Sequence, residues 1–395
     1  MHVFGVIAEY DPFHNGHAYH LSQMRKAGAT HIVVVLGADF TQRGEPAYVN
    51  RLARAKAALQ NGADLVIAMP ITGTLAGAQR FAENGVALLN ALGCVETLSF
   101  GSECGDIDAL KNIAELLRND LLNQKINQTL SSPQTFAALR ENAVRELFGN
   151  DAADLLKTPN NSLGIAYIQA IRSLNADFSP HTVKRNGAKH GGSPVTLFAS
   201  AGYLRSLKTV QDMQGYIPEN VTQLLQNEIT AERAPVLMDS MEIAILSRLR
   251  ALCESHLCDL PDCSEGLEHR LFTAVRKAGT LKELEEALKT KRYPLARLRR
   301  FYLSAALGIT KADSVLLPQY LRVLGATQRG FEVLKHCKDT ACLPIIQKAS
   351  DANVLTGAAR HQWELDNATA DFYSLGMPIP VACGYEHTQK FFSLK

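Results

Sequence analysis

The sequence has no apolar run that approaches the roughly 20 residues of a membrane-spanning helix. It also reaches two acidic residues, Glu9 and Asp11, too early for the apolar core of a secretory signal peptide. An excess of charge of one sign is missing as well, because 41 Lys and Arg nearly balance 39 Asp and Glu. We therefore predict a cytoplasmic protein with no membrane partner, on which any surface for nucleic acid is a local patch.

The chain has eight cysteines but no pair with the C-x2-C spacing of common zinc sites. Cys253, Cys258 and Cys263 recur at intervals of five residues, with His256 between them. Structural zinc is one interpretation of this group, and reduced thiols are the usual state of cytoplasmic cysteines. We predict that the group holds no metal.

Apolar runs that suit buried strands alternate with helical patterns in the first half of the chain. The predicted strands cover 3–8, 31–36, 64–69, 96–100 and 181–185, and the predicted helices cover 50–60, 77–92, 106–117, 133–148 and 158–174. A strand about every thirty residues, with helices between, predicts an α/β fold with a doubly wound parallel sheet. Ligands of such sheets bind beyond the carboxyl ends of the strands, so a site is expected in the loops there.

The second half of the chain has helical patterns and no further run typical of a strand. The predicted helices cover 236–253, 265–277, 281–288 and 294–307. A chain of 395 residues is long enough for two domains. We predict the doubly wound domain over 1–210 and a mainly α-helical domain over 211–395.

Two histidines follow the first predicted strand, after the turn Tyr10-Asp11-Pro12. A helix is expected to begin near Asn15, whose side chain is a good cap, so that His14 and His17 lie in its solvent-facing first turn. Free backbone N–H groups and the positive end of the helix dipole make such a turn an anion site. Gly16 leaves room for a base or a phosphate to approach the backbone.

Two other interpretations of these histidines are open. His14, His17 and His20 are spaced by three, so on a helix they share one face and have the donor type for zinc. Alternatively, they are ordinary surface histidines, because short motifs recur by chance.

The string His14-Asn15-Gly16-His17 resembles the HxGH signature of the nucleotidyltransferase superfamily, which includes adenylyltransferases and class I aminoacyl-tRNA synthetases. The longer string Glu9 to His17 resembles a narrower family, the tRNA-Met cytidine acetate ligases, in which asparagine is usual in place of Asp11. Resemblance to that family implies that His14 and His17 are catalytic and that ATP is a substrate with Mg²⁺. The residues expected to bind ATP are Ile7, Ala8, Glu9, Tyr10, Asp11, Pro12, Phe13, His14, Asn15, Gly16, His17, Ala18, Tyr19, His20, Gly101, Asn161, Arg185 and Asn186.

Five further stretches resemble the same family: Gln42 to Pro46, Phe100 to Glu103, Pro159 to Gly164, Ser264 to Glu268 and Lys289 to Tyr293. The resemblance implies that an asparagine of the third stretch contacts the nucleotide, and we choose Asn161; a helix cap explains the same residues without function. Arg185 ends the last predicted strand, where an arginine points towards the same crevice.

The match to the closing Ser-x-Thr-x-x-Arg motif of adenylyltransferases is incomplete. Ser200 and Arg205 are present, but Gly202 stands where threonine is usual, which removes one hydroxyl donor. The pair Lys189-His190 also replaces the Tyr-His of many relatives.

A basic stretch lies in the predicted helical domain, with Tyr293, Phe301 and Tyr302 interleaved. Clustered cations bind phosphates through counterion release, and aromatic rings stack on unpaired bases. A solvated helix face is the alternative. The residues expected to bind tRNA are Lys289, Lys291, Arg292, Arg297, Arg299 and Arg300.

The family resemblance implies an enzyme that activates acetate with ATP and passes the acetyl group to N4 of the wobble cytidine, position 34, of elongator tRNA-Met. The first alternative is an adenylyltransferase that acts on a small phosphorylated acceptor and has no need of a basic helical domain. The second is a catalytically silent tRNA-binding protein. The intact residues His14, Gly16 and His17 speak against the second alternative.

Overall fold

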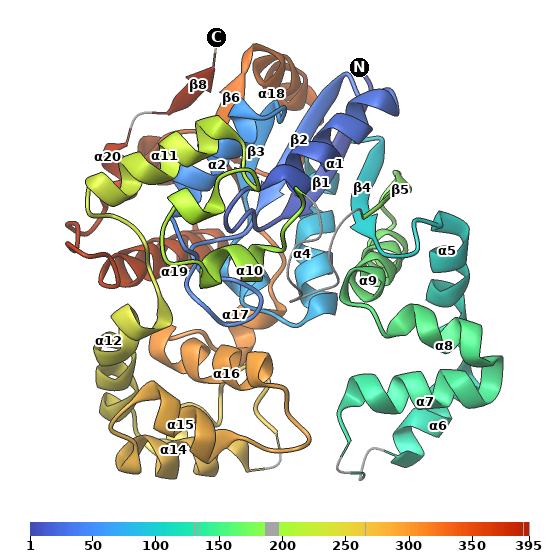
Figure 1. Cartoon of the computed structure of the whole chain (residues 1–395), viewed down its shortest axis with the longest axis vertical. Helices are drawn as coiled ribbons and strands as arrows, with labels where there is room; N and C mark the ends of the chain where they lie inside the picture. Colours follow the sequence, from blue (N-terminus) through green and yellow to red (C-terminus); the bar gives the residue numbers. More distant parts are fainter. Residues whose placement is uncertain (130–131, 133, 186–196, 265, 390, 395) are drawn as a thin grey trace.

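The computed structural model describes residues 1–129, 132, 134–185, 197–264, 266–389 and 391–394 (Figure 1). Its sheet has the strand order β5-β4-β1-β2-β3-β6-β7, and β8 also pairs with β6. The strands are β1 (Val3–Ala8), β2 (His31–Leu36), β3 (Leu65–Ala68), β4 (Thr97–Ser102), β5 (Ser179–Lys184), β6 (Leu321–Thr327), β7 (Ile345–Ile346) and β8 (Phe392–Leu394). The pairs among β1 to β5 are all parallel, so the predicted doubly wound sheet is confirmed. The strand order reverses between β1 and β4, where such sheets bind ligands.

Helices cover both faces of the sheet. Alternate residues of one strand enter different cores: Val33 and Val35 of β2 pack on one face, and Ile32 and Val34 on the other. This is why the strand is apolar throughout instead of alternating with polar residues. The first face is covered by α4 (Ala78–Ala91), α9 (Pro159–Ser173) and α18 (Gln328–Thr340), and the second by α1 (Asn15–Lys26), α2 (Arg51–Gln60) and α11 (Glu219–Thr230).

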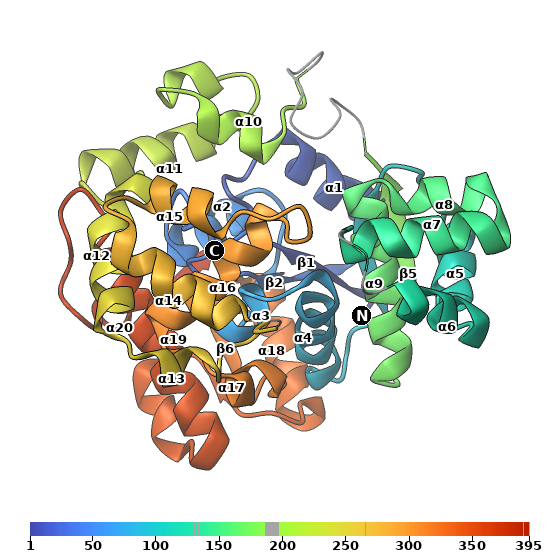
Figure 2. The same ribbon diagram turned by 90° about the horizontal axis from the view of Figure 1, so that it is seen from below.

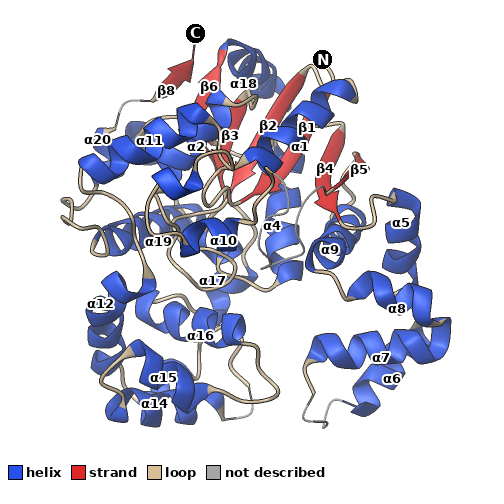
Figure 3. Cartoon of the chain, in the orientation of Figure 1, coloured by secondary structure: helices blue, strands red, loops and turns tan. Residues whose placement is uncertain are grey.

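Two groups of helices extend beyond the sheet on the side towards which β1 and β4 run (Figures 2 and 3). One consists of α5 (Ile107–Leu116), α6 (Asp120–Thr129), α7 (Phe136–Phe148) and α8 (Asn150–Leu156). The other, the helical lobe, consists of α12 (Met238–Ala251), α13 (Glu254–Leu257), α14 (Leu267–Lys277), α15 (Leu281–Leu288) and α16 (Leu295–Leu307). The remaining helices are α3 (Ile71–Thr74), α10 (Ala201–Ser206), α17 (Lys311–Val315), α19 (Gly357–Ser374) and α20 (Tyr385–Thr388), with 3₁₀ turns at Gln211–Met213 and Ala349–Val354. Among the described residues, no helix is both long and apolar enough to cross a membrane.

The expectation that the second half of the chain contains no strand is wrong. Strand β6 returns to the sheet and pairs antiparallel with β3. Its sequence, LRVLGAT, interrupts the apolar pattern with Arg322 and Gly325, which hides the strand. The sheet therefore takes strands from both halves of the chain.

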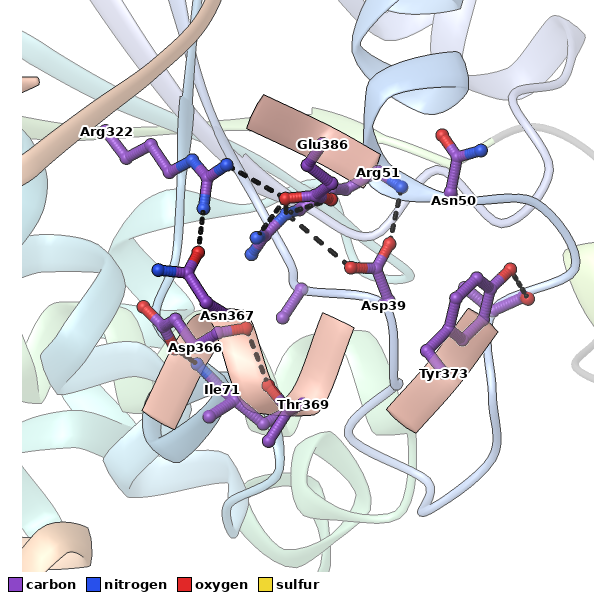
Figure 4. A network of polar contacts seen from close by, with 12 residues as sticks. Asp39, Asn50, Arg51, Ile71, Arg322, Asp366, Asn367, Thr369, Tyr373 and Glu386 are labelled. Carbon is purple, nitrogen blue, oxygen red and sulfur yellow. Dashed lines mark hydrogen bonds and ion pairs between the residues drawn. The ribbon is translucent and has the colours of Figure 1, made fainter. Parts of the chain in front are cut away.

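A buried ionic network explains how an arginine fits inside β6 (Figure 4). Glu386 of α20 accepts hydrogen bonds from Nη2 of Arg51 at 2.5 Å and from Nη2 of Arg322 at 2.9 Å. The backbone N–H of Arg51 also donates to Asp39, in the loop after β2, at 2.6 Å. Burial alone would raise the pKa of Glu386, but the two guanidinium groups outweigh burial and hold the pKa at about 2. The last helix is thus tied to a loop at the ligand-binding edge of the sheet.

Candidate active site

Two adjoining cavities of about 70 and 210 Å³ open at the carboxyl ends of β1 and β4. They share four residues, His17, His20, Gly101 and Arg185, so they form one site. Gly101 leaves room for the Arg185 side chain, because a Cβ at residue 101 would lie only 3.3 Å from Cγ of the arginine. The site therefore combines imidazoles, one guanidinium and a helix start, which is a set suited to an anion.

Backbone N–H groups at the start of α1 fix the tautomer of both histidines. His14 caps α1, and its Nδ1 accepts a hydrogen bond from the backbone N–H of Gly16 at 3.0 Å. The backbone N–H of His14 donates in turn to Nδ1 of His17 at 3.2 Å. Because both Nδ1 atoms are acceptors, the neutral rings carry their protons on Nε2. Each ring keeps an Nε2–H group for an incoming oxygen.

Burial keeps these imidazoles neutral in the free protein. It lowers the pKa of His14 to about 3, with Arg185 adding to the effect. It also lowers the pKa of His17 well below its usual value, and His14 and Arg185 act in the same direction. The pKa of His20 falls to about 4 through burial and through His181 and Arg185. The neutral imidazoles beside the Arg185 guanidinium leave this part of the site suited to an anion such as a phosphate.

The structure corrects two details of the predicted turn. His14, and not Asn15, caps the helix, while the Asn15 side chain donates to the carbonyl of Gly215 at 2.8 Å. The turn is also not solvent-facing, since His14 is only 4% exposed. The His14 ring stacks on the His17 ring at a centroid distance of 3.6 Å, and Tyr10 packs against the His17 ring at 4.7 Å. Sequence propensity favours Asn as a cap, and this aromatic packing overrides it.

One buried and one partly buried arginine fix the loops around the site. Arg54 donates to the carbonyls of Glu9 at 2.7 Å and Ala38 at 2.5 Å, which joins the loops after β1 and β2. Arg205 of the incomplete closing motif donates to the carbonyl of Asp11 at 2.7 Å. Ser200 of the same motif caps α10. No local sequence signal marks Arg54, because its partners include backbone atoms far away in the chain.

Most of the residues predicted to bind ATP line the two cavities. These are Ile7, Ala8, Glu9, Tyr10, Asp11, His14, Gly16, His17, Tyr19, His20, Gly101 and Arg185. Pro12, Phe13, Asn15, Ala18 and Asn161 lie outside the lining of these two cavities. Asn186 and the Lys189-His190 pair fall outside the described residues. Gln42, Phe100, Tyr167 and Phe198 line the site as well and were not predicted to bind ATP.

Asn161 joins the start of α9 to the loop after β4 through hydrogen bonds. Its Oδ1 accepts from the backbone N–H of Glu103 at 2.9 Å, and its own N–H donates to Oε2 of Glu103 at 2.8 Å. The neighbouring Asn160 lines the larger cavity and donates to Oε1 of Glu103 at 2.6 Å. The direct contact of Asn161 with a nucleotide stays a prediction, and its observed contacts position Asn160.

The basic stretch divides into two parts. Arg299 of α16 pairs with Glu285 at 2.7 Å and also with Glu45, so it joins the helical lobe to the loop after β2. Arg300 donates to the carbonyl of Gln42 at 2.9 Å and Arg297 to that of Asp262 at 3.1 Å. The exposed cations of the stretch, Lys289 and Lys291, lie before α16, and Arg292 beside them is partly exposed.

The residues offer little for a resident metal. Within the described ranges, no three His, Cys, Asp or Glu side chains are grouped so that they could hold an ion. Of the two carboxylates lining the larger cavity, Glu9 accepts from the N–H of Gln42 at 2.6 Å and Asp11 from that of Tyr48 at 2.7 Å. A Mg²⁺ ion that arrives with ATP would be held chiefly by phosphate oxygens and water.

The fold and the histidine turn define a nucleotidyl transferase, and the model of the HIGH Nucleotidyl Transferase family matches residues 1–386. A tRNA(Met) cytidine acetate ligase from Acetivibrio thermocellus is 33% identical over 410 residues, which cover 98% of this chain and 99% of that protein. A second, from Syntrophomonas wolfei, is 35% identical and covers 96% of both chains. The chain belongs to the family of tRNA(Met) cytidine acetate ligases.

Solved structures agree with this assignment. The chain is similar to the crystal structure of Thermotoga maritima TmcAL in its apo form, with a TM-score of 0.93 and 30% identity. It is also similar to the structure of that protein bound with alpha-thio ATP, with a TM-score of 0.92. Each match covers 100% of both chains.

Proposed function

We propose that this protein is an ATP-dependent ligase that forms acetyl-adenylate from ATP and acetate and then acetylates N4 of the wobble cytidine of elongator tRNA-Met. The observation that carries the proposal is the pair of neutral imidazoles whose Nε2–H groups remain for substrate at the start of α1. The names of the full-length relatives support the acceptor and the acid.

The activation half-reaction needs stabilisation of charge at the α-phosphate. An acetate oxygen attacks the α-phosphorus while the bond to pyrophosphate breaks in line, and negative charge accumulates on the phosphate oxygens. The Nε2–H groups of His14 and His17 and the helix start can donate to those oxygens. The Arg185 guanidinium can balance the negative charge of acetate or of the ATP phosphates. Mg²⁺ is expected to accompany ATP, and no step is assigned to it.

The exposed lysines support a tRNA surface in the helical lobe. Lys289 and Lys291 lie in the turn between α15 and α16, and Arg299 and Arg300 anchor that turn region to the loop after β2. Phosphate contacts made there would bring a tRNA close to the ligand-binding edge of the sheet. We therefore assign ATP to residues 1–210 and tRNA to residues 211–395 in the cytoplasm.

One incubation tests the proposal. The protein is mixed with ATP, labelled acetate and total tRNA, and the tRNA is digested to nucleosides. We expect label in N4-acetylcytidine only when ATP is present, and none with a His14→Asn variant. Label on no nucleoside, together with AMP attached to a small phosphorylated compound, would instead support an adenylyltransferase.

A further inference from the structure

A chain of three side chains leads from the cavity into the sheet. Nε2 of His20, in α1, lies 2.9 Å from Oγ of Ser99, in β4. The same oxygen lies 3.0 Å from Nδ1 of His181, in β5. His20 lines both cavities, Ser99 is fully buried, and His181 is partly exposed on the edge strand. The three residues thus connect the reaction cavity with the outer edge of the sheet.

The fold places these groups with little freedom. Ser99 and His181 are direct partners in the parallel pairing of β4 with β5. His20 is one turn after His17 on α1, so the helix that carries the anion-binding histidines also carries the first member of the chain. The His181 ring is held by edge-on packing against Phe4 at a centroid distance of 6.0 Å.

The serine hydroxyl between two imidazoles can only donate to one ring and accept from the other. If His20 donates through Nε2–H, Ser99 donates to Nδ1 of His181, and Nδ1 of His20 has a free lone pair. Among the described residues, no hydrogen-bond donor to this Nδ1 is found. Burial lowers the pKa of both His20 and His181, so both rings are neutral near pH 7 and each has a lone pair for a proton. Because burial also disfavours the charged form of His20, a proton that reaches this ring is not stable there and needs a path out.

The second half-reaction releases one proton. This step rests on the proposed function: the cytidine N4 attacks the acetyl carbonyl, the new N–C bond forms, and the C–O bond to AMP breaks. AMP leaves as the anion, and the nitrogen must lose one proton to become a neutral amide. A base within reach of the cavity is therefore required.

We propose that His20 accepts this proton and that Ser99 and His181 pass it out of the cavity. The proton binds to Nδ1 of His20, the Nε2 proton of His20 moves to Oγ of Ser99, and the hydroxyl proton of Ser99 moves to Nδ1 of His181. The positive charge then rests on His181, which does not line the cavities and is partly exposed to solvent. Ser99 and His181 are positioning residues in this scheme, since they act through His20.

The alternative is that the three residues only fasten α1 to the sheet. In that case their loss disturbs His14 and His17 as well, and both half-reactions suffer together. A relay affects the transfer step alone, because acetate activation releases no proton to the cavity. Measuring the half-reactions separately therefore distinguishes the two interpretations.

The test compares Ser99→Ala, Ser99→Thr and His181→Asn with the parent protein. Acetate-dependent exchange of pyrophosphate into ATP reports activation, and single-turnover transfer from preformed acetyl-adenylate to tRNA reports the second step. We expect Ser99→Ala and His181→Asn to slow transfer by about 10²-fold while exchange stays within about twofold of the parent. Ser99→Thr retains the hydroxyl and should recover most of the transfer rate. Ser374→Ala, which removes a buried serine hydroxyl in α19, is the control.

Each outcome decides a different question. Transfer at the parent's rate in both Ser99→Ala and His181→Asn overturns the relay, as does an equal loss of exchange and transfer. If Ser99→Ala does not fold, as judged by its unfolding transition, His181→Asn decides, because its amide can replace the hydrogen bond without carrying a proton. A parent protein without acetate-dependent exchange would refute the proposed function itself, and this result is separate from the other two.

Discussion

The backbone N–H of His14 and the Nδ1 atom of His17 are 3.2 Å apart, and this hydrogen bond decides which nitrogen of His17 meets the substrate. With Nδ1 occupied, the neutral ring presents Nε2–H. The same turn uses Nδ1 of His14 to cap the helix, so one residue serves both the fold and the site.

The first prediction separates these two roles of His14. His14→Ala should lose about 10²–10³ in the rate of acetate-dependent pyrophosphate exchange, since it removes one charge-stabilising donor. It should also lower the free energy of unfolding by about 1 kcal/mol, because the cap is removed. His14→Asn restores a cap but not the Nε2–H group, so it should regain stability and stay inactive. Active His14→Asn protein would show that the imidazole is not needed for catalysis.

The second prediction concerns the pH dependence of stability. The folded-state pKa of His20 is about 4, below that of an unfolded histidine, so between about pH 6.5 and 4 the unfolded chain binds the proton more readily. The contribution of His20 to stability is therefore fully present above pH 6.5 and is lost as the pH falls. Each such histidine adds a slope of up to about 1.4 kcal/mol per pH unit.

Denaturant unfolding at several pH values between 4 and 7 checks this slope. Burial raises the pKa of Glu9 and Asp11, whose titration acts in the opposite direction, so the difference between parent and variant is the diagnostic quantity. The His20→Asn variant should show a shallower loss of stability with acid than the parent. Parallel curves for the two proteins would contradict the assigned protonation state.

The third prediction concerns the two parts of the basic stretch. Replacing Lys289 and Lys291 by alanine should weaken tRNA binding and reduce the log–log salt slope by roughly one for each tRNA phosphate that the lysines no longer neutralise. Pyrophosphate exchange should be unchanged. A Lys335→Ala, Lys338→Ala double variant removes the same charge from exposed positions on α18 and is the control. An unchanged affinity and salt slope in the first variant would identify the stretch as a solvated face.

Arg299→Ala should behave differently, because its partners are Glu285 and Glu45 and not solvent. Removal of the guanidinium takes a positively charged partner from two partly buried carboxylates. This loss is expected to cost about 1–3 kcal/mol of stability. The effect on the salt slope of tRNA binding should be small. Urea unfolding and salt titration of this one variant measure both quantities, and a large change in slope with intact stability would contradict the assignment.

The fourth prediction compares a buried with an exposed ion pair. Glu386→Ala removes the carboxylate shared by Arg51 and Arg322, leaves two buried cations, and should cost about 3–5 kcal/mol. Glu364→Ala, which breaks an exposed pair with Arg360, should cost less than about 1 kcal/mol. Equal midpoints of urea unfolding for the two variants would show that the buried network contributes nothing specific.

Local sequence signals predict the features of this protein that depend on neighbouring residues. The buried strands around Val33 and the histidine turn are of this kind, and the structure has both. Strand β6 was not predictable in this way, because the charge that permits Arg322 in a strand comes from Glu386, 64 residues away. Likewise, Arg299 has the pattern of a surface cation until the fold brings Glu45 to it from 254 residues away.

The choice between Asn160 and Asn161 shows another limit. Successive residues on a helix differ by about 100° in direction, so a motif places a segment at a site without stating which of two asparagines faces it. Here both asparagines bind Glu103, but only Asn160 lines the cavity. The hydrogen bonds between Asn161 and Glu103 fix the rotation of α9. Glu103 lies in the loop after β4, far from α9 in the sequence, so the local motif does not reveal this contact.

The pairing of Arg51 with Glu386 also sets an order of events during synthesis. The two residues are 335 positions apart, so a ribosome adding 5–20 residues per second needs roughly 20–70 s between them. During that time Arg51 has no carboxylate from α20, and the loop that carries Asp39 lacks its final support. A chain interrupted before Glu386 would contain the complete histidine turn but would lack the carboxylate that Arg51 and Arg322 share.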